Sequence, residues 1–497
     1  MKPDALVKLE QLSLGVTDCS VVAPAGAKPG GVDPLGLRQV NFDLMNEIFP
    51  GLNNVARHIR PFTLVAWAWR RTISLARDRK IKLNLSQHED FVARIEVAFA
   101  WSMLQRHGTT MLDLPGKRRI MDLWGNKKAI RFGTEEWNAF AKARRNSTAL
   151  TAAINYGPGL RAFRILVDDT YQPGVRVPGK DAERHLDAFE KRLAPILKHK
   201  LFQGWEPCVL TRTTAEKWAD NWDIDDLRGP ERKSMHARLI GDLSSKGRRG
   251  GFRLLARAFE ETDEQERDEG TLRHVMYDLE AEDLHEEVLR WRRIQVRQGF
   301  RLSLESLFEW MIGQIAGETL STEELAQRLL NEAAIDHEVT AREWFKALVA
   351  DDITVIDAME GLQSCLQARQ GIGDAALVAL AVSVLSPGHL HDHSTRRERL
   401  PIALAAADLD RLADGPPKRL LSHIIESWII AQHTYWSVGR GLADARAGAK
   451  KILRLRLVLE PTGWRVTRGK GSAGMPKPTP DRLRTAISLA AESRIIG

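Results

Sequence analysis

The sequence predicts a mainly α-helical protein, with a multi-helix body and a small α+β module at its C-terminal end. Three observations support this fold class. Apolar residues recur at helical spacing through most of the chain. Helix-capping boxes occur at Ser86, Thr213 and Ser321, and an alternation typical of a strand follows residue 450. With 497 residues, of which 43% are hydrophobic, the chain can form two to four domains with substantial cores.

The N-terminal helical domain is expected to span residues 1–112 and to contain three helices. The first follows the apolar spacing of residues 37–48, and the second covers Phe62–Ala76, an apolar stretch with two tryptophans. The third is expected to begin at the capping box Ser86-x-x-Glu89, because a serine oxygen can accept an early helical N–H while the glutamate reaches back. These helices would form one bundle.

A central helical domain is expected over residues 113–360. Two further capping boxes, Thr213-x-x-Glu216 and Ser321-x-x-Glu324, mark helix starts within it. Two basic segments, residues 117–128 and 244–253, contain glycine, lysine and arginine and are expected to be loops.

The C-terminal region, residues 361–497, is expected to hold more helices and a basic β-hairpin module. Leucines at 453, 455 and 457 alternate with arginines, which predicts a half-buried strand. Glu460–Gly463 then predicts a turn, and residues 464–466 a return strand. Thr479 and Pro480 predict the start of a last helix. A winged-helix-like arrangement of these elements is a possibility that the pattern leaves open.

Cysteine usage and hydropathy exclude several classes of protein. The three cysteines are far apart and lack CxxC spacing, so neither a disulfide framework nor a cysteine zinc site is expected. The start has no apolar signal-peptide core. The apolar run Ala375–Leu385 is about half of the roughly 20 residues that span a bilayer. We therefore expect a soluble, cytoplasmic protein without membrane contact.

Positive charge is concentrated at the C-terminal end. The net charge is +8, and residues 436–497 contain thirteen Lys/Arg and four Asp/Glu. Such a segment can bind DNA phosphates, and the candidate nucleic-acid-binding residues are Lys450, Lys451, Arg454, Arg456, Arg465, Arg468 and Lys470. The same charges could instead face solvent, an acidic protein, or the acidic segment 260–287, which has thirteen acids and two bases.

Common enzyme signatures are absent from the sequence. It contains no phosphate loop of the form G-x-x-x-x-G-K-[ST], no G-x-S-x-G, and no G-x-G-x-x-G that leads from a strand into a helix. Imidazoles and a carboxylate do cluster at His389, His391, Asp392 and His393, and such groups bind zinc or other transition metals. A hydrated polar loop is the alternative for this cluster.

A second acid–base candidate lies on one predicted helix. Glu426 and His433 are seven residues apart, so on an α-helix they would share a face and could transfer protons. A polar pair at a helix contact is the alternative. No cofactor is expected from the sequence.

The stretch "DPLGLRQVNFDLMNEIFPGLNNVARHIRPFTLVAWAWR" resembles the N-terminal signature of a family of bacterial proteins encoded in anti-phage defence islands. The matching residues are Asp33, Pro34, Leu35, Gly36, Phe49, Pro50, Gly51, Asn53, Arg57, His58, Arg60 and Trp67. "NSTAL" at 146–150, "YGPG" at 156–159 and "ESWIIAQHTYW" at 426–436 belong to the same pattern. The resemblance implies a role beside helicases, nucleases or ATPases in phage defence, and it implies no catalytic residue.

A polar motif lies between two apolar runs of the N-terminal region and consists of Asn53, Arg57, His58 and Arg60. Arg57 and Arg60 would lie on one face of a helix, and arginine can bind carboxylate or phosphate through two parallel hydrogen bonds. Asparagine can cap helical N–H groups. The motif is therefore expected either to lock helices together through buried hydrogen bonds or to bind an anion such as a nucleotide.

These observations predict a non-catalytic subunit of a bacterial anti-phage defence system that is associated with nucleic acid or acts as a scaffold. DNA would contact the basic C-terminal end, and partner enzymes such as a helicase, nuclease or ATPase would bind the helical body. The alternative is a divergent metal-dependent nuclease or hydrolase that uses the His389–His393 cluster. A third possibility is a purely protein-binding subunit.

Overall fold

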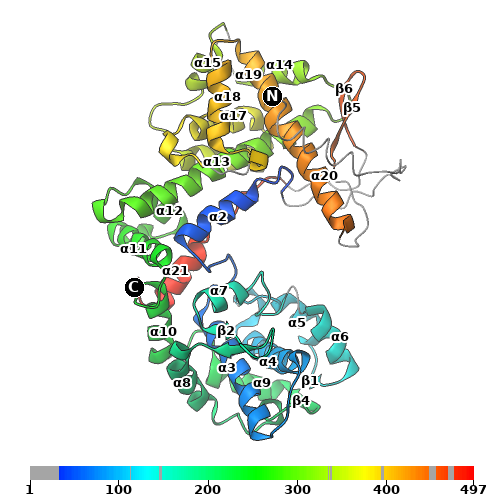
Figure 1. The fold of residues 1–497 in the computed structure, drawn as a ribbon, viewed down its shortest axis with the longest axis vertical. Coiled ribbons are helices and arrows are strands. Elements are labelled where there is room, and N and C mark those ends of the chain that lie inside the picture. Colours follow the sequence, from blue (N-terminus) through cyan, green and yellow to red (C-terminus); the bar gives the residue numbers. More distant parts are fainter. Residues whose placement is uncertain are drawn as a thin grey trace. The chain divides into compact units, whose positions relative to one another are not determined.

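The computed structural model describes residues 33–111, 113–144, 148–333, 335, 338–392, 397–446, 455–467 and 475–497. The fold is mainly α, as predicted (Figure 1). In the part of the chain that is described, the strands form three separate antiparallel pairs, β1 with β4, β2 with β3 and β5 with β6. Helix packing therefore supplies the core, and the strand pairs are local additions.

The chain divides into two compact units that are each discontinuous in sequence. Unit 1 comprises Met1–Leu44 and Leu289–Thr479, and unit 2 comprises Met45–Val288 and Pro480–Gly497. The boundaries differ from the consecutive segments 1–112, 113–360 and 361–497 that the sequence suggests. Changes in composition and runs of proline and glycine indicate loops, whereas a compact unit is defined by which helices pack together. Here residues 480–497 pack with residues 45–288, so they belong to unit 2.

Unit 2 contains helices around the long apolar helices α3 and α4. Almost every residue in the first half of α3 is buried, including Trp67 and Trp69, so its hydrophobic surface extends around the helix. The elements of unit 2 are α3 (Ile59–Asp78), α4 (Leu85–Met111), α5 (Lys117–Trp124), β1 (Ala129–Phe132), α6 (Glu135–Arg144), α7 (Gly157–Ala162), β2 (Leu166–Asp168), β3 (Arg176–Pro178), α8 (Glu183–Leu193), β4 (Cys208–Thr211), α9 (Arg212–Trp222), α10 (Gly229–Leu239), α11 (Lys246–Glu261), α12 (Glu269–Asp278) and α21 (Leu483–Glu492).

Unit 1 is built on α13, which carries buried polar residues as well as apolar ones. Two helices, α2 (Arg38–Ile48) and α13 (His285–Gln314), contribute residues to both units. The other elements of unit 1 are α14 (Thr322–Glu332), α15 (Ala341–Ala347), α16 (Val355–Ala368), α17 (Ile372–Leu385), α18 (Ile402–Leu412), α19 (Pro417–His423), the π-helix Ile424–Ile430, α20 (Ala431–Arg446), β5 (Leu457–Glu460) and β6 (Gly463–Val466).

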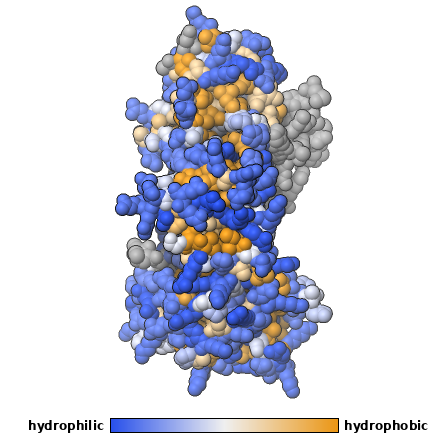
Figure 2. Space-filling model, turned by 90° about the vertical axis from the view of Figure 1, so that its left-hand side faces the viewer, coloured by the Kyte–Doolittle hydropathy of each residue, from blue (hydrophilic) through white to orange (hydrophobic). Residues whose placement is uncertain are grey.

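Short 3₁₀ turns complete the secondary structure. They lie at Lys180–Ala182, Lys200–Phe202, Glu264–Glu266, Glu282–Leu284, Gly388–Leu390 and Arg397–Arg399. None of the described helices is both long enough and apolar enough to cross a membrane. Figure 2 shows hydrophilic residues over most of the face that it views, with hydrophobic residues reaching the surface in patches.

The predicted C-terminal hairpin is confirmed. Leu457 pairs with Val466 and Glu460 with Gly463, so Pro461 and Thr462 form the turn. Trp464 also exchanges main-chain hydrogen bonds with Leu320, just before α14. The hairpin belongs to unit 1 and α21 to unit 2, so a single C-terminal module that contains both is not confirmed.

Several predicted helix starts and loops are corrected. The box Ser321-x-x-Glu324 caps α14 as predicted. Helix α9 instead begins one residue after Thr211, because β4 ends there and the chain passes directly into the helix. Residues 117–124 and 246–261 are helices rather than basic loops. The glycines at 247 and 251 let α11 lie against the main chain of Glu47 and Ile48, where a side chain would collide.

Helix α21 begins at Leu483, three residues after the predicted start at Pro480. The carboxylate of Asp481 accepts the Leu483 N–H at 3.2 Å, and Arg482 adopts a left-handed conformation with φ of 69°. In unit 2, α11, α12 and α21 pack against one another (Figure 1). The last helix is thus an integral part of unit 2.

Candidate functional site

The D-P-L-G motif and the "AQHTYW" segment meet in unit 1. The side chains of Gln432 and Trp436 donate to the carbonyl oxygens of Leu35 and Asp33, at 2.9 and 3.0 Å. A side chain on Gly36 would lie 2.4 Å from the indole of Trp436, so only glycine fits at this contact, where φ is 71°. The two motifs therefore form a structural junction between the start of α2 and α20.

His433 lies at the centre of this junction. Its Nδ1–H donates to the Pro34 carbonyl at 2.9 Å, and its Nε2 accepts the Arg456 N–H at 3.0 Å. Burial lowers the pKa of His433 to about 4, so the imidazole is neutral at pH 7. Glu426 is exposed and does not share this environment, because the π-helix Ile424–Ile430 changes the angular offset between the two residues. The predicted acid–base pair is not formed.

Unit 1 is expected to lose stability as the pH falls from 6.5 to 4. The folded pKa of His433 lies below that of the unfolded chain, so the unfolded state takes up a proton first. A shift of this size corresponds to about 3 kcal/mol. Hydrogen exchange of α20 amides at pH 6.5 and 4.5 measures the loss, which should be smaller in His433→Gln. His389→Gln, at an exposed histidine, is the control. An equal pH dependence in wild type and His433→Gln would refute this role.

The second group of motifs meets in unit 2. Asn53 accepts the N–H groups of Val55 and Ala56 at 3.0 Å, and its amide donates to the carbonyl of Asn155. The His58 N–H donates to the Tyr156 hydroxyl at 3.3 Å. The "RHIR" and "YGPG" segments are therefore joined by hydrogen bonds. The helix-capping role expected for Asn53 is not observed, because α3 begins only at Ile59 and Asn53 instead closes a turn in the preceding loop.

The C-terminal helix closes the same junction. One oxygen of Glu492 lies 2.7 Å from His58 Nδ1, and the other accepts the Ile59 N–H at 2.7 Å. Burial would lower the pKa of His58, but the hydrogen bond and the charge of Glu492 outweigh it and raise the pKa above its usual value. His58 and Glu492 thus fix the start of α3.

The two arginines of the motif have different surroundings. Arg57 forms an ion pair with Asp113 at 2.5 Å, near the surface. Arg60 is fully buried, pairs with Glu231 at 2.9 Å, and donates to the carbonyl oxygens of Asp223 and Asp226. Its guanidinium also lies over the Phe189 ring. The contacts of Arg60 are internal, which favours the helix-locking role over anion binding.

Two more buried arginines hold the F-P-G turn. Arg248 donates to the Pro50 carbonyl at 3.1 Å, and Arg482 donates to the Phe49 carbonyl at 3.1 Å and to Asn46 at 2.7 Å. Burial lowers the pKa of each guanidinium to about 10, so both stay charged at pH 7. Arg482, counted with the basic C-terminal end in the sequence, is therefore a structural residue.

The histidine cluster of unit 1 is only partly described. His389 is exposed, and its carbonyl accepts a hydrogen bond from Arg293. The Asp392 carboxylate accepts the Ile402 N–H at the start of α18 at 2.9 Å and pairs with buried Arg297 at 3.3 Å. His391 is buried, and His393 lies outside the described residues. The carboxylate of Asp392, which the predicted metal site would need as a ligand, is therefore already paired with the guanidinium of Arg297.

The predicted DNA-binding residues differ in how far they can be placed. Lys450, Lys451, Arg454, Arg468 and Lys470 lie outside the described residues. Arg456 contacts both oxygens of Glu309 and lies over the Phe308 ring. Arg465 pairs with Glu460 at 2.9 Å. The two described arginines are thus neutralised by carboxylates of their own unit.

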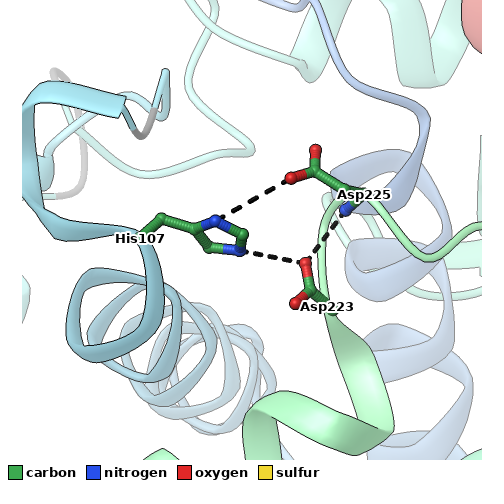
Figure 3. Close-up of side chains that lie close together, drawn as sticks. All are labelled: His107, Asp223 and Asp225. Atoms are coloured by element: carbon green, nitrogen blue, oxygen red, sulfur yellow. Dashed lines mark hydrogen bonds and ion pairs between the residues drawn. The ribbon is translucent and has the colours of Figure 1, made fainter.

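One group of possible metal ligands is found among the described residues, and the sequence did not suggest it. His107 Nε2 lies 3.0 Å from Asp223, and Nδ1 lies 3.8 Å from Asp225 (Figure 3). Arg106 also contacts Asp223, at 2.8 Å. The group can either tie the end of α4 to the loop after α9 or hold a cation. The guanidinium of Arg106 disfavours a cation because it already neutralises Asp223.

A second hydrogen-bonded group was also missed from the sequence. Asp408 accepts from His423 at 2.9 Å, from Trp428 at 3.1 Å and from Arg411 at 3.0 Å, and Ser427 lies 3.2 Å from the other imidazole nitrogen. Burial raises the pKa of Asp408, but these hydrogen bonds outweigh it and lower the pKa to about 2. The carboxylate thus joins α18 to the π-helix. The His-x-x-x-Ser spacing is visible in the sequence, whereas Asp408 comes from another helix.

A cavity of about 390 Å³ lies in unit 2 between α3, β3 and α8, lined by Arg70, Arg71, Ile73, Ser74, Arg77, Val177, Pro178, Glu183 and Glu190. Arg70 pairs with Glu183, Asp187 and Glu190, at 3.0, 2.6 and 2.5 Å. Basic and acidic groups in this cavity largely neutralise one another, so it favours neither anions nor cations.

Comparisons of the chain with protein-family models, with curated proteins and with solved structures find no match.

Proposed function

We propose that the protein is a non-catalytic scaffold subunit that associates with nucleic acid and acts in a bacterial anti-phage defence system. The defence context rests on the resemblance of the D-P-L-G, F-P-G and R-H-x-R motifs alone. The scaffold role rests on how the motif side chains are used.

The observation that carries the proposal is that the motif side chains bind groups of their own unit. Asn53, Arg60, Gln432, His433 and Trp436 all bond to main-chain atoms. Side chains that hold main-chain carbonyls in the interior specify a shape and are not available to a substrate. Motifs used in this way are expected in a protein that presents a defined surface to partners.

Association with nucleic acid is supported by charge. The chain has a net charge of +8, and five of the candidate basic residues, Lys450, Lys451, Arg454, Arg468 and Lys470, lie in the C-terminal segment with its excess of Lys and Arg. Lysine and arginine that contact phosphates give affinity that depends little on sequence and strongly on salt.

The test is binding of the full-length chain to a labelled 30-base-pair DNA duplex across a salt series. We expect binding at low salt that weakens steeply as salt rises. Replacing the five residues Lys450, Lys451, Arg454, Arg468 and Lys470 together by glutamine is expected to weaken it. If the intact chain fails to bind at low salt, association with DNA is refuted and a role in binding proteins alone remains.

A metal-dependent hydrolase is the rival, and His107, Asp223 and Asp225 are the possible metal ligands that it could use. Metal analysis of the same purified protein separates the two functions. Stoichiometric zinc or manganese that is lost in His107→Ala, together with cleavage of the duplex, would support the rival and contradict a non-catalytic role.

A further inference from the structure

A described segment of unit 2, outside the C-terminal end, also carries a high density of positive charge. Residues 117–131 contain six Lys/Arg and one Asp, a net charge of +5 in fifteen residues. This density exceeds that of residues 436–497, where thirteen bases and four acids are spread over sixty-two residues. The segment forms α5, a short loop and β1.

An aromatic cluster holds this segment in place. Trp124 of α5 contacts Trp137 and Phe140 of α6, and Phe132 of β1 packs edge-on against Trp137, with ring centroids 4.8 Å apart. Trp124, Phe132 and Trp137 are almost fully buried. Because Trp124 and Phe132 are buried in this cluster, α5 and β1 form a fixed support for the exposed basic side chains that they and the connecting loop carry.

Three basic side chains of this segment are exposed and have no ion-pair partner among the described residues. Arg118, Lys128 and Arg131 are exposed, and no carboxylate of the described part of the chain forms an ion pair with any of them. Arg131 lies opposite Val209 in the β1–β4 pair, and Val209 is 48% exposed. We call Arg118, Lys128 and Arg131 the α5–β1 basic surface.

The α5–β1 basic surface contrasts with the basic residues predicted from the sequence. Arg456 and Arg465 each have a carboxylate partner, at Glu309 and Glu460. A phosphate that approached either of these arginines would have to compete with that carboxylate. A phosphate at Arg118, Lys128 or Arg131 meets no such competitor within the described residues.

We propose that the α5–β1 basic surface binds the phosphate backbone of duplex DNA. This inference rests on the proposed association with nucleic acid and names a surface for it in unit 2. The contact is independent of sequence because cations recognise phosphates rather than base edges. Each phosphate contact releases counterions, so each contact contributes about 0.9 to the slope of log affinity against log salt.

The experiment measures binding of full-length protein to a labelled 30-base-pair duplex by fluorescence anisotropy, from low to moderate salt. The test variant is the triple substitution Arg118→Gln, Lys128→Gln and Arg131→Gln. The matched control is Lys191→Gln, Lys198→Gln and Lys217→Gln, three exposed lysines on the α8–α9 side of unit 2, which removes the same charge. Circular dichroism melting verifies that both variants stay folded.

We expect the test variant to bind at least tenfold more weakly at low salt, with a slope smaller by about 2 to 3. The control triple should change neither the affinity nor the slope by a comparable amount. Equal losses in the two triples would show a general effect of net charge and would overturn the assignment of the surface.

Two other outcomes separate this inference from the proposed function. If only the variant that lacks Lys450, Lys451, Arg454, Arg468 and Lys470 loses DNA binding, the α5–β1 assignment fails while association with DNA stands. If the intact chain binds poly-glutamate through Arg118, Lys128 and Arg131 but does not bind DNA, both fail and the surface recognises acidic protein.

Discussion

Deletion of residues 480–497 is expected to unfold unit 2, although it removes only one short helix. In α21, Leu483, Ala486, Leu489 and Ala490 are fully buried. Burying each leucine contributes about 1.5–3 kcal/mol. The deletion also removes Arg482, which holds the F-P-G turn, and Glu492, which holds the start of α3. The summed loss exceeds about 5 kcal/mol, which is comparable to the whole stability of a typical domain.

Limited proteolysis of the deletion variant, with cleavage sites mapped by mass spectrometry, measures this effect. We expect rapid cleavage within residues 45–288, while fragments from unit 1 persist. The control is the full-length variant Arg484→Gln, Arg494→Gln, which removes two exposed positive charges of the deleted segment and keeps α21. Protection of residues 45–288 in the deletion variant would show that α21 is dispensable.

Replacement of Arg60 by alanine is expected to destabilise unit 2 by about 3–5 kcal/mol. Arg60 and Glu231 are both buried, with side chains 0% and 1% exposed. Without the guanidinium, the Glu231 carboxylate remains in the interior without its charge partner, and the carbonyls of Asp223 and Asp226 lose a donor. Guanidinium denaturation followed by tryptophan fluorescence measures the loss.

Two further variants test whether the loss of stability in Arg60→Ala comes from the buried ion pair. Arg212→Ala breaks an ion pair with Glu216 in which both side chains are 48% exposed, and it should cost no more than about 1 kcal/mol. The double variant Arg60→Ala, Glu231→Ala should be more stable than Arg60→Ala, because it removes the unpaired buried carboxylate. An Arg60→Ala variant as stable as Arg212→Ala would mean that the buried pair contributes little.

Local sequence patterns predicted the fold class and several elements well. The apolar stretch Phe62–Ala76 predicted α3 correctly, because the first half of this helix is buried on all sides. The alternation near residue 457 predicted the β5–β6 hairpin correctly. The Ser321 box was right because both of its partners lie within one helical turn. Thr213 was wrong as a cap, because β4 runs directly into α9 and leaves the capping position to Thr211.

The candidate sites depended on partners far away in the sequence, and no local pattern reveals these. Arg456 is neutralised by Glu309, which is 147 residues away in the sequence. Glu231 and Glu492, the partners of Arg60 and His58, are equally remote. The α5–β1 basic surface could have been found from a short window of charge, but its exposure depends on the aromatic cluster beneath it.

The discontinuity of both units also constrains how the chain folds as it is synthesised. Residues 33–44 can join unit 1 only after the segment from 289 onward has been made, and unit 2 lacks α21 until residues 483–492 emerge. Folding therefore cannot be completed segment by segment from the N-terminus, as is usual for consecutive domains. Until α21 is made, the surfaces of α11 and α12 that pack against it stay uncovered. A chain that stops early would therefore expose these surfaces to proteases and chaperones.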